Sequence, residues 1–509
     1  MKRTLLLVPL AATLCGCELG PNYARPAAPV PSDYRESRGW MPASPQQAAG
    51  WEDWWAIYND PVLDALEKQV DISNQNLKAA EAAYRVARAE VGIERGALLP
   101  TFTANASVRK TGGGSRNTIV GAGDASGTSV VTNSSRSSTT YQTSLGGSWD
   151  LDVWGRIRRT VEGGVATAQA SAADIAAARL SAQSLLAVDY FQLRAADEEA
   201  QLLNATIQDF ELALQIARNR FQVGIATEAD VLAAQTQIDN VQAQLVNLQL
   251  TRAEMEHAIA TLTGKPPSEL AVAATNLPTI IPVVPAGVPS TLLERRPDIA
   301  SSEYTMAAAN ADIGVAIAAW YPDLTLTGSY GFASSSLGSL FSAPNSVWSL
   351  GPSLAEVIFN GGAREAQTEQ ARARYDQAVA TYRQTVLTAF QQVEDQLAAL
   401  RVLEQQAAVE NQTVSDARRS EELALNQYRA GTADFTTVIT AQTTRFNAEN
   451  AALSVLNQRL AASVNFVVAL GGGWDNSRLP QPGFFYRLPE VTANDGPSQA
   501  ATPVSVGSP

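Results

Sequence analysis

The residue types that usually carry catalysis are sparse in this sequence and are not grouped. The only histidine, His257, lies in a helix-like segment beside apolar Met255, where a packed or solvated side chain is the commoner role. Asp150 and Asp152 could bind a cation, although their spacing of two also fits the water-facing side of a strand. Gly471-Gly472-Gly473 lacks the Lys-Ser/Thr of a phosphate-binding loop and predicts a helix end. We therefore expect no catalytic site, no metal and no cofactor.

Covalent lipid chemistry is indicated at the N-terminus. Lys2 and Arg3 precede a short apolar run, as in a secretory signal peptide. The run ends in Leu-Cys-Gly-Cys at 14–17, which resembles the bacterial lipobox, so we expect Cys17 to be the first mature residue and to carry lipid. An ordinary secretory cleavage is the alternative. Glu18, rather than Asp, follows the cysteine and favours onward sorting to the outer membrane.

Composition excludes several classes of partner and of fold. The 509 residues carry a formal charge of −13, so a nucleic-acid backbone is not an expected partner. The only two cysteines, Cys15 and Cys17, leave no disulfide framework in the mature chain. Apart from the signal segment, no stretch approaches the roughly 18 consecutive apolar residues of a spanning helix. If this chain crosses a membrane, it must do so with strands.

The sequence contains two similar halves. Residues 89–92, Ala-Glu-Val-Gly, recur 222 residues later as Ala-Asp-Ile-Gly at 311–314. Residues 221–224, Phe-Gln-Val-Gly, recur 207 residues later as Tyr-Arg-Ala-Gly at 428–431. The offset shrinks because a Gly-, Ser- and Thr-rich stretch at 111–140 lengthens one loop of the first copy. We therefore expect a pseudo-symmetric molecule.

Four segments alternate with the period of a half-buried strand. They lie near residues 101–108, 141–153, 323–332 and 347–358. In the first, Phe102 and Val108 share one face, and Thr101 and Asn105 share the other. In a soluble sandwich the apolar face would pack on another sheet. In an outer-membrane barrel it would face lipid, with water on the polar side.

Aromatic residues near the strand ends favour the membrane interpretation, because barrels carry Trp and Tyr girdles at both interfaces. The expected interface residues are Trp149, Trp154, Trp320, Tyr321 and Trp348. Four strands cannot close alone, since known bacterial barrels need about 8 or more. An open edge in lipid would leave backbone groups unpaired at several kcal/mol each. Two or three chains must then share one barrel.

Proline-free, glycine-poor segments between the strands predict long helices. They lie at about 156–223, 227–262, 364–430 and 434–470. The first and third would reach ~100 Å at 1.5 Å per residue, and apolar residues at alternating three- and four-residue steps predict coiled-coil seams. Gly224 and Gly431 break the helices, so each copy should end in a hairpin whose tip points away from the strands. Single helices at about 54–96 and 292–319 are expected before the strands.

The fold class is therefore a mixed α+β membrane protein, internally duplicated. Each chain should contribute four strands to a shared barrel that a coiled-coil helical extension continues. The expected parts are a signal peptide, a lipidated Pro-rich segment, the first repeat, a linker, the second repeat, and a C-terminal belt segment with a disordered tail. Their bounds are 1–16, 17–50, 51–270, 271–291, 292–473 and 474–509.

An ordered set of motifs resembles the TolC-like outer membrane factors, specifically the lipoprotein branch (OprM-like, NodT-type) of resistance-nodulation-division (RND) multidrug efflux systems. The matching pieces are Cys17, Gly-Pro-Asn-Tyr-Ala-Arg-Pro at 20–26, Asp-Pro at 60–61, Leu-Glu-Arg-Arg-Pro-Asp-Ile at 293–299, Tyr-Arg-Ala-Gly at 428–431 and Leu-Gly-Gly-Gly-Trp at 470–474. The resemblance covers about residues 14–487. It implies a homotrimer with a twelve-stranded barrel, a periplasmic tunnel of helices and an equatorial belt. The implied function is a passive exit duct for drugs or other small toxic compounds.

The resemblance also implies partners at the hairpin tips, where a periplasmic adaptor would couple the channel to an inner-membrane RND transporter. The expected adaptor contacts are Val223, Gly224, Ile225, Ala226, Gly431, Thr432 and Phe435. The expected aperture residues are Asp230, Tyr428, Asp434, Thr437 and Thr440. A hydrogen bond between Asp230 and Tyr428 is expected to latch the hairpins. Threonines stand at 437 and 440, where the family usually has carboxylates, and Asp434 is the nearest acidic residue.

Two other functions stay open from the residues. One is an outer-membrane channel for type I protein secretion, which shares the architecture. The other is a coiled-coil lipoprotein scaffold that forms no channel. The lipobox and the Gly-Gly-Gly-Trp ending favour efflux.

Overall fold

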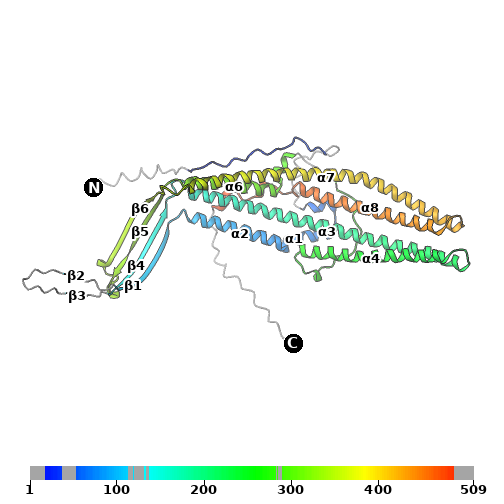
Figure 1. The fold of residues 1–509 in the computed structure, drawn as a ribbon, viewed down its shortest axis with the longest axis horizontal. Coiled ribbons are helices and arrows are strands. Elements are labelled where there is room, and N and C mark those ends of the chain that lie inside the picture. Colours follow the sequence, from blue (N-terminus) through cyan, green and yellow to red (C-terminus); the bar gives the residue numbers. More distant parts are fainter. Residues whose placement is uncertain are drawn as a thin grey trace, which may run out of the picture.

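The computed structural model describes residues 18–36, 53–112, 118–119, 131–132, 137–282, 284 and 289–486. A small sheet forms one end of an elongated molecule, and two helical hairpins extend from it toward the other end (Figure 1). The predicted signal peptide, the predicted lipid site Cys17 and the chain after residue 486 lie outside the described residues.

The same order of elements occurs twice. The first half contains α1 (Pro61–Ser73), α2 (Gln75–Gly96), β1 (Thr101–Gly112), β4 (Ser137–Asp150), α3 (Arg156–Gln222) and α4 (Glu228–Leu262). The second half contains α5 (Leu292–Arg295), α6 (Pro297–Ala318), β5 (Asp323–Ser334), β6 (Ser346–Ala355), α7 (Ala363–Ala430) and α8 (Phe435–Ala469). The remaining elements are β2 (Thr118–Ile119), β3 (Val131–Thr132), α9 (Pro482–Phe485) and short 3₁₀ turns such as η2 (Trp54–Tyr58).

The strands form one antiparallel sheet in the order β1-β4-β5-β6. Its register keeps apolar side chains in rows, with Leu145 opposite Tyr330 and Tyr330 opposite Trp348. Neighbouring rows are polar, as where Ser148 lies opposite Thr327. A slip of one residue would send every side chain to the other face, so the alternating sequence fixes this register.

The apolar face of the sheet is open to its surroundings. Phe102, Val108, Trp348, Leu350 and Leu354 are all more than half exposed. Within the described residues no second sheet covers this face, because the only other sheet is the two-stranded β2-β3 ribbon. A soluble sandwich is therefore excluded, since its apolar face would be buried.

The predicted strands are confirmed, with different ends. β1 continues to Gly112 and β4 begins at Ser137, so the strands take up both ends of the stretch predicted as a loop at 111–140. β4 stops at Asp150 rather than at residue 153. The physical reason is Asp152, whose carboxylate accepts hydrogen bonds from the backbone N–H groups of Ile157 and Arg158 and so belongs to the start of α3.

The two hairpins match the predicted breaks. α3 has 67 residues and α7 has 68, which corresponds to about 100 Å each. Gly224 and Gly431 both adopt φ of +78°, the left-handed conformation that glycine allows at a helix end. Thr227 and Asp434 then cap the returning helices α4 and α8. Both tips lie at the end of the molecule opposite the sheet (Figure 1).

The single helices predicted at 54–96 and 292–319 are wrong, because each is broken. Asn74 ends α1, caps α2 by accepting from Leu77 N, and donates to the Leu262 carbonyl oxygen. Arg296 separates α5 from α6 because Pro297 follows it, and a residue before proline disfavours the helical conformation.

The main core joins both repeats. Its fully buried side chains include Trp54, Leu186, Tyr190, Val386 and Phe466. Among the described helices α8 alone is long and apolar enough to span a membrane by composition. It packs on α3 and α7 and buries Val464, Phe466 and Val467 in this core, so its apolar character has a structural cause.

Candidate functional site

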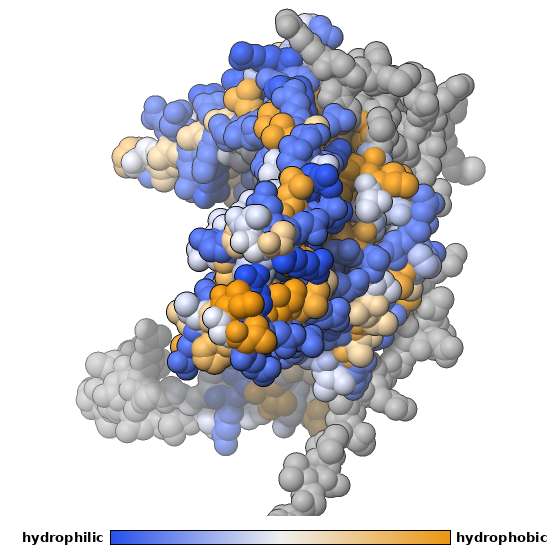
Figure 2. Space-filling view, turned by 90° about the vertical axis from the view of Figure 1, so that its right-hand side faces the viewer, coloured by the Kyte–Doolittle hydropathy of each residue, from blue (hydrophilic) through white to orange (hydrophobic). Residues whose placement is uncertain are grey.

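The tip of the α3–α4 hairpin exposes apolar side chains. Figure 2 faces the end that carries the tips and shows hydrophobic side chains gathered among hydrophilic ones. Phe221, Val223, Ile225 and Leu232 of the α3–α4 hairpin are exposed. Apolar exposure of this kind marks a contact surface. The predicted adaptor contacts in this hairpin thus lie on the surface, and their role stays a prediction.

One predicted adaptor contact is misplaced. Phe435 is buried, and its ring centroid lies 5.3 Å from that of Tyr428. It is the first residue of α8, where the returning helix packs against the end of α7. Phe435 therefore holds the tip together and presents no surface to a partner, whereas Gly431 and Thr432 are exposed.

The predicted hydrogen bond between Asp230 and Tyr428 is absent. Asp230 is the third residue of α4, where it forms a reciprocal capping box with Thr227. The Tyr428 hydroxyl is buried and has no hydrogen-bond partner among the described residues. The local helix cap satisfies the Asp230 carboxylate, so the expected latch is wrong in this form.

Arg220 replaces Asp230 as the partner of Tyr428. Its Nη1 donates to the Tyr428 carbonyl oxygen, and its guanidinium carbon lies 4.4 Å from the centroid of the ring. Burial raises the pKa of the Tyr428 phenol, which Arg220 opposes. The contact joins the end of α3 to the end of α7, and therefore one hairpin to the other.

A second arginine joins the hairpins farther from the tips. Arg445 of α8 forms ion pairs with Asp209 of α3 and, at 2.8 Å, with Glu421 of α7. Glu449 lies 3.7 Å away on the same helix. In addition, Gln442 Nε2 donates to the Asp209 carbonyl oxygen. Sequence reasoning missed this cluster, although an arginine between apolar positions of α8 was a visible signal.

The predicted aperture residues of α8 share its first two turns. The Asp434 carboxylate accepts from Thr437 N at 3.0 Å and from Thr437 Oγ1 at 2.6 Å. These hydrogen bonds lower the pKa of Asp434, so it stays ionised. Thr440 Oγ1 donates to the Thr436 carbonyl oxygen. Asp434 is thus a helix cap in this structure, and an aperture role for these residues stays a prediction.

Aromatic side chains form two levels along the sheet. Near the helices, the Trp154 and Tyr321 rings lie 4.8 Å apart, and Trp149 and Trp320 are close by in sequence. The indole nitrogens of Trp149 and Trp320 donate to Leu98 O and Thr368 Oγ1. At the far end of the sheet, Trp348 lies opposite Tyr330. Two aromatic levels separated by an apolar band are the pattern of a membrane barrel.

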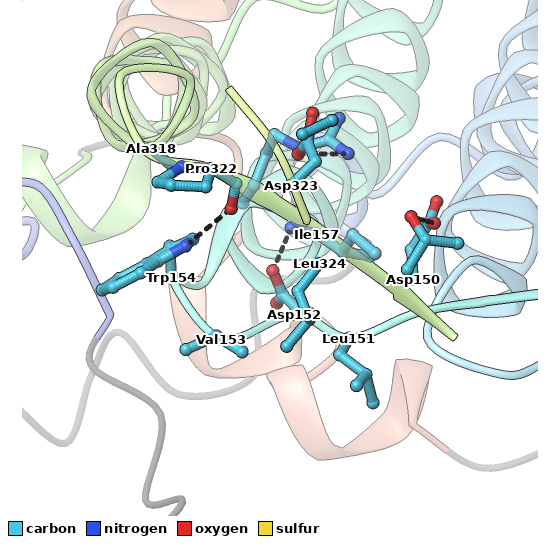
Figure 3. A pocket seen from close by; sticks show the side chains of 13 residues that line it. Asp150, Leu151, Asp152, Val153, Trp154, Ile157, Ala318, Pro322, Asp323 and Leu324 are labelled. Carbon is cyan, nitrogen blue, oxygen red and sulfur yellow. Dashed lines mark hydrogen bonds and ion pairs between the residues drawn. The ribbon is translucent and has the colours of Figure 1, made fainter. Parts of the chain in front are cut away.

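The acidic pair at the end of β4 does not form a cation site. Asp150 accepts from Thr325 Oγ1 at 2.9 Å, whereas Asp152 accepts from the backbone of Ile157 and from Arg158. Figure 3 shows both carboxylates at a cavity of about 330 Å³, each turned toward its own partner. In the described part of the chain, no cluster of three or more His, Cys, Asp or Glu side chains could hold a metal ion.

Comparison with known proteins decides the family. A sequence profile described as outer membrane efflux protein matches residues 66–265 and 288–472. The chain belongs to this family. The resemblance to outer membrane factors is thereby confirmed, and so are its place in the outer membrane and its periplasmic helical extension.

Relatives of this outer membrane efflux protein match it over nearly its whole length. TtgC of Pseudomonas putida, a probable efflux pump outer membrane protein, is 31% identical over 476 residues, which cover 93% of this chain and 96% of the relative. OpmQ of Pseudomonas aeruginosa, a pyoverdine export outer membrane protein, is 31% identical over 477 residues, covering 94% and 98%.

Solved structures share the fold. The outer-membrane channel OprN superposes with a TM-score of 0.81 at 30% identity, covering 90% of this chain and all of the other. The Campylobacter jejuni channel CmeC has a TM-score of 0.82 at 26% identity, covering 92% and 97%. The open MtrE channel of Neisseria gonorrhoeae has a TM-score of 0.77 at 28% identity, covering 90% and 99%. This outer membrane efflux protein is therefore a channel component.

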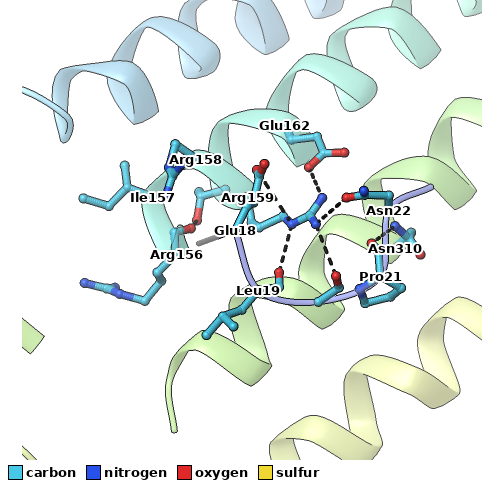
Figure 4. Close-up of polar contacts among 12 residues, drawn as sticks. Glu18, Leu19, Pro21, Asn22, Arg156, Ile157, Arg158, Arg159, Glu162 and Asn310 are labelled. Carbon is cyan, nitrogen blue, oxygen red and sulfur yellow. Dashed lines mark hydrogen bonds and ion pairs between the residues drawn. The ribbon is translucent and has the colours of Figure 1, made fainter. Parts of the chain in front are cut away.

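The segment that follows the predicted lipid site is clamped to the helices, which sequence reasoning missed. The buried Arg159 of α3 donates to Leu19 O at 3.0 Å and to Asn22 Oδ1 at 2.8 Å (Figure 4). Gly20 lies so close to α6 that a Cβ there would be 2.5 Å from Gly314 Cα. In this efflux protein, the first described residues are thus fixed to α3 and α6 next to the sheet.

Proposed function

We propose that this protein works as a homotrimer, in which three four-stranded sheets close one barrel and the hairpins form a periplasmic tunnel. One observation carries the proposal: the sheet has an uncovered apolar face, a polar face and, among the described strands, two edges without a partner, β1 and β6. Each unpaired backbone group in lipid would cost several kcal/mol, so the edges need further strands. Copies of the same sheet supply them with matching faces.

The trimer would serve as the passive exit duct of a tripartite RND-type efflux system. Relatives are named as outer membrane proteins of efflux pumps for toluene and other solvents, and of pyoverdine export. We infer a similar cargo of small organic compounds. The polar row of serines and threonines on one sheet face would line a water-filled pore.

The partners would be a periplasmic adaptor and an inner-membrane transporter. The exposed apolar residues at the α3–α4 tip support docking of an adaptor there. A lipid on Cys17 would anchor each protomer at the level of the clamped segment 18–22. The protein would carry no catalytic site and need no cofactor, because the transporter supplies the energy.

Reconstitution tests the proposal. We expect the detergent-purified protein to have the mass of a trimer in native mass spectrometry and to conduct ions in planar bilayers. A stable monomer without conductance would exclude the channel. Deletion of the gene should raise susceptibility to solvents or drugs. Loss of an exported protein instead, with resistance unchanged, would favour type I secretion.

A further inference from the structure

We propose that the apolar face of the sheet contains a slot that holds one acyl chain of a membrane phospholipid. The slot is a hollow of about 470 Å³ above the two inner strands, β4 and β5. This volume lies within the range of roughly 300–1,000 Å³ that is typical of small-ligand sites. The inference rests on the proposed function in one respect, because the apolar face must meet lipid for the slot to be filled.

The hollow exists because one row of the sheet lacks its two central side chains. Across the four strands, this row consists of Phe102, Gly147, Gly328 and Leu350. Gly147 lies directly opposite Gly328, so only backbone separates the side chains at the two ends of the row. Side chains alternate between the faces of a strand, and Phe102 and Leu350 assign this row to the apolar face. The paired glycines therefore form the floor of the hollow.

The walls of the hollow are apolar. They come from the two ends of the glycine row and from the rows on either side of it, in which Leu145 lies opposite Tyr330 and Trp149 lies opposite Leu326. None of the described residues that line the hollow carries a charge. A charged or strongly polar group placed there would lose its hydration without gaining a partner. The lining thus selects a hydrocarbon ligand.

The hollow lies at the depth of the membrane hydrocarbon. Trp149 belongs to the aromatic level near the helices, whereas Tyr330 and Trp348 lie opposite each other at the far level. Gly147 is two residues from Trp149, and Gly328 is two residues from Tyr330. Aromatic levels of this kind mark the two interfaces of a bilayer. The ligand between them is therefore an acyl chain rather than a headgroup.

The hollow is also separate from the edges at which further strands would join. Its floor belongs to β4 and β5, which pair with each other and with the edge strands β1 and β6 (Figure 1). Copies of the chain that paired with those edges would leave the inner strands facing lipid. A neighbouring subunit would therefore not fill the hollow, and each chain should hold one acyl chain of its own.

Contacts outside the hollow fix its walls. Trp149 Nε1 donates to Leu98 O at 2.9 Å, and the Tyr330 ring packs edge-on against Phe332 with 5.7 Å between the centroids. A Cβ at Gly147 would lie 3.1 Å from Phe102 Cε1, so the Phe102 ring borders the floor closely. A preformed site loses little conformational entropy when its ligand binds. The slot should therefore retain a chain longer than the rest of the apolar face does.

A side chain on the floor would test the slot. A Cβ at Gly328 would lie 3.3 Å from Leu350 Cδ1, which is the end of a flexible side chain. Gly328→Val should therefore fit after a small shift of Leu350, and valine suits a strand. Gly351→Val is the matched control. Gly351 lies opposite Thr327 on the polar face, and a Cβ there would meet nothing within 4 Å in the described part of the chain.

Native mass spectrometry measures the effect on the full-length protein. The detergent-purified protein would be mixed with phosphatidylethanolamine that carries palmitoyl and oleoyl chains, and the retained phospholipid counted per chain. A lipid on Cys17 is distinguished because it is covalent. We expect about one phospholipid per chain in the natural protein and in Gly351→Val, and about ten-fold weaker binding in Gly328→Val. Phosphatidylglycerol with the same chains should bind equally, because no charged residue lines the slot.

Photocrosslinking of the natural protein locates the chain without any substitution. Liposomes of phosphatidylethanolamine with a diazirine in the middle of one acyl chain would contain the protein. We expect the label mainly within residues 145–149 and 326–330, which line the hollow. Val108 and Leu354, which are exposed on the same face outside the hollow, should be labelled much less. This measurement also decides the question if Gly328→Val does not fold.

The outcomes separate the slot from the proposed function. Equal phospholipid binding by the natural protein and Gly328→Val, or label spread evenly over the apolar face, would overturn the slot and leave the channel intact. Equal loss of binding in Gly328→Val and Gly351→Val would overturn it as well. A monomer without conductance that still retains one phospholipid per chain would refute the proposed function and support the slot.

Discussion

The guanidinium of Arg220 covers the ring of Tyr428, 4.4 Å from its centroid, and the same side chain donates to the Tyr428 carbonyl oxygen. This contact holds the end of the first hairpin to the end of the second. It requires the aromatic ring and the backbone of Tyr428 but makes no use of the hydroxyl. The two tips of this channel component are therefore joined by an arginine–aromatic contact.

Arg220→Ala should loosen the tips and raise single-channel conductance. It removes a cation–π contact and a charged hydrogen bond, together about 2 to 4 kcal/mol. Tyr428→Phe is the matched control, because it keeps the ring and deletes a hydroxyl that has no hydrogen-bond partner among the described residues. Conductance in planar bilayers that changed with Tyr428→Phe and not with Arg220→Ala would restore the latch predicted from the sequence.

Arg445→Met should weaken the contact between the two hairpins farther from the tips. The Arg445 side chain is 18% exposed and pairs with Asp209 and with Glu421, which is 10% exposed, so its loss leaves the nearly buried Glu421 carboxylate unpaired. We expect about 1–3 kcal/mol of destabilisation, measured as a lower unfolding temperature in detergent. Arg419→Met is the control. Arg419 also pairs with a carboxylate, that of Glu422, but the two side chains are 65% and 59% exposed, and exposed pairs contribute at most about 1 kcal/mol. Equal losses from both variants would contradict the assigned role of Arg445.

Local signals explain what the sequence could predict. Gly224 and Gly431 mark the hairpin ends because a left-handed helix end needs glycine, a requirement set by one residue. Strand faces were predictable for the same reason, since alternation is local. The capping box of Thr227 and Asp230 is local too and could have excluded the predicted latch.

Long-range contacts explain what the sequence could not predict. Asn74 breaks a helix by bonding to Leu262 O, 188 residues away. Arg445 meets Asp209 only after two hairpins have packed, and Arg159 meets Leu19 across 140 residues. No spacing rule relates such residues, so the links between hairpins and the clamp on the N-terminal segment emerge only from the folded chain.

Leu350→Arg should block membrane insertion. Leu350 is exposed on the apolar face near the middle of β6, opposite Gly328. A charge on the lipid face near the midplane costs about 2–4 kcal/mol in each subunit. Ser349→Arg, one residue away on the polar face, should insert normally and change ion selectivity instead. Heat-modifiable mobility on gels reports insertion, and reversal potentials report selectivity. Normal insertion of the Leu350 variant would contradict a lipid-facing position.

Arg159→Lys should free residues 18–22 from the helices. Arg159 is 2% exposed and makes hydrogen bonds to Leu19 O, Gly20 O and Asn22 Oδ1, which a lysine cannot reproduce with its single nitrogen. Limited proteolysis should then cut within residues 18–36. Arg156→Lys is the control, because the Arg156 side chain is 44% exposed and lies 3.7 Å from Asp323. Cleavage that is equal in both variants would mean that Arg159 does not hold the segment.

Glu67→Gln should remove a pH dependence of stability. Glu67 of α1 is fully buried, both carboxylate oxygens lack hydrogen-bond partners within the described residues, and burial raises its pKa well above the usual value, with a smaller contribution from Asp71. A raised folded pKa means that the native state holds the proton longer than the unfolded chain does. Its contribution to stability is therefore complete below the unfolded pKa of about 4.3 and is lost as the pH rises toward the folded pKa.

Unfolding temperatures in detergent at pH 5 and pH 8 would measure this loss. Each unit of difference between the folded and unfolded pKa corresponds to about 1.4 kcal/mol, so the natural protein should lose stability across this range. Glu67→Gln cannot ionise and should show a smaller loss, with its advantage greatest at pH 8. Glu81→Gln, at an exposed position of α2, should behave like the natural protein. Equal losses of stability in the natural protein and the Glu67 variant would contradict a raised pKa of Glu67 in the folded protein.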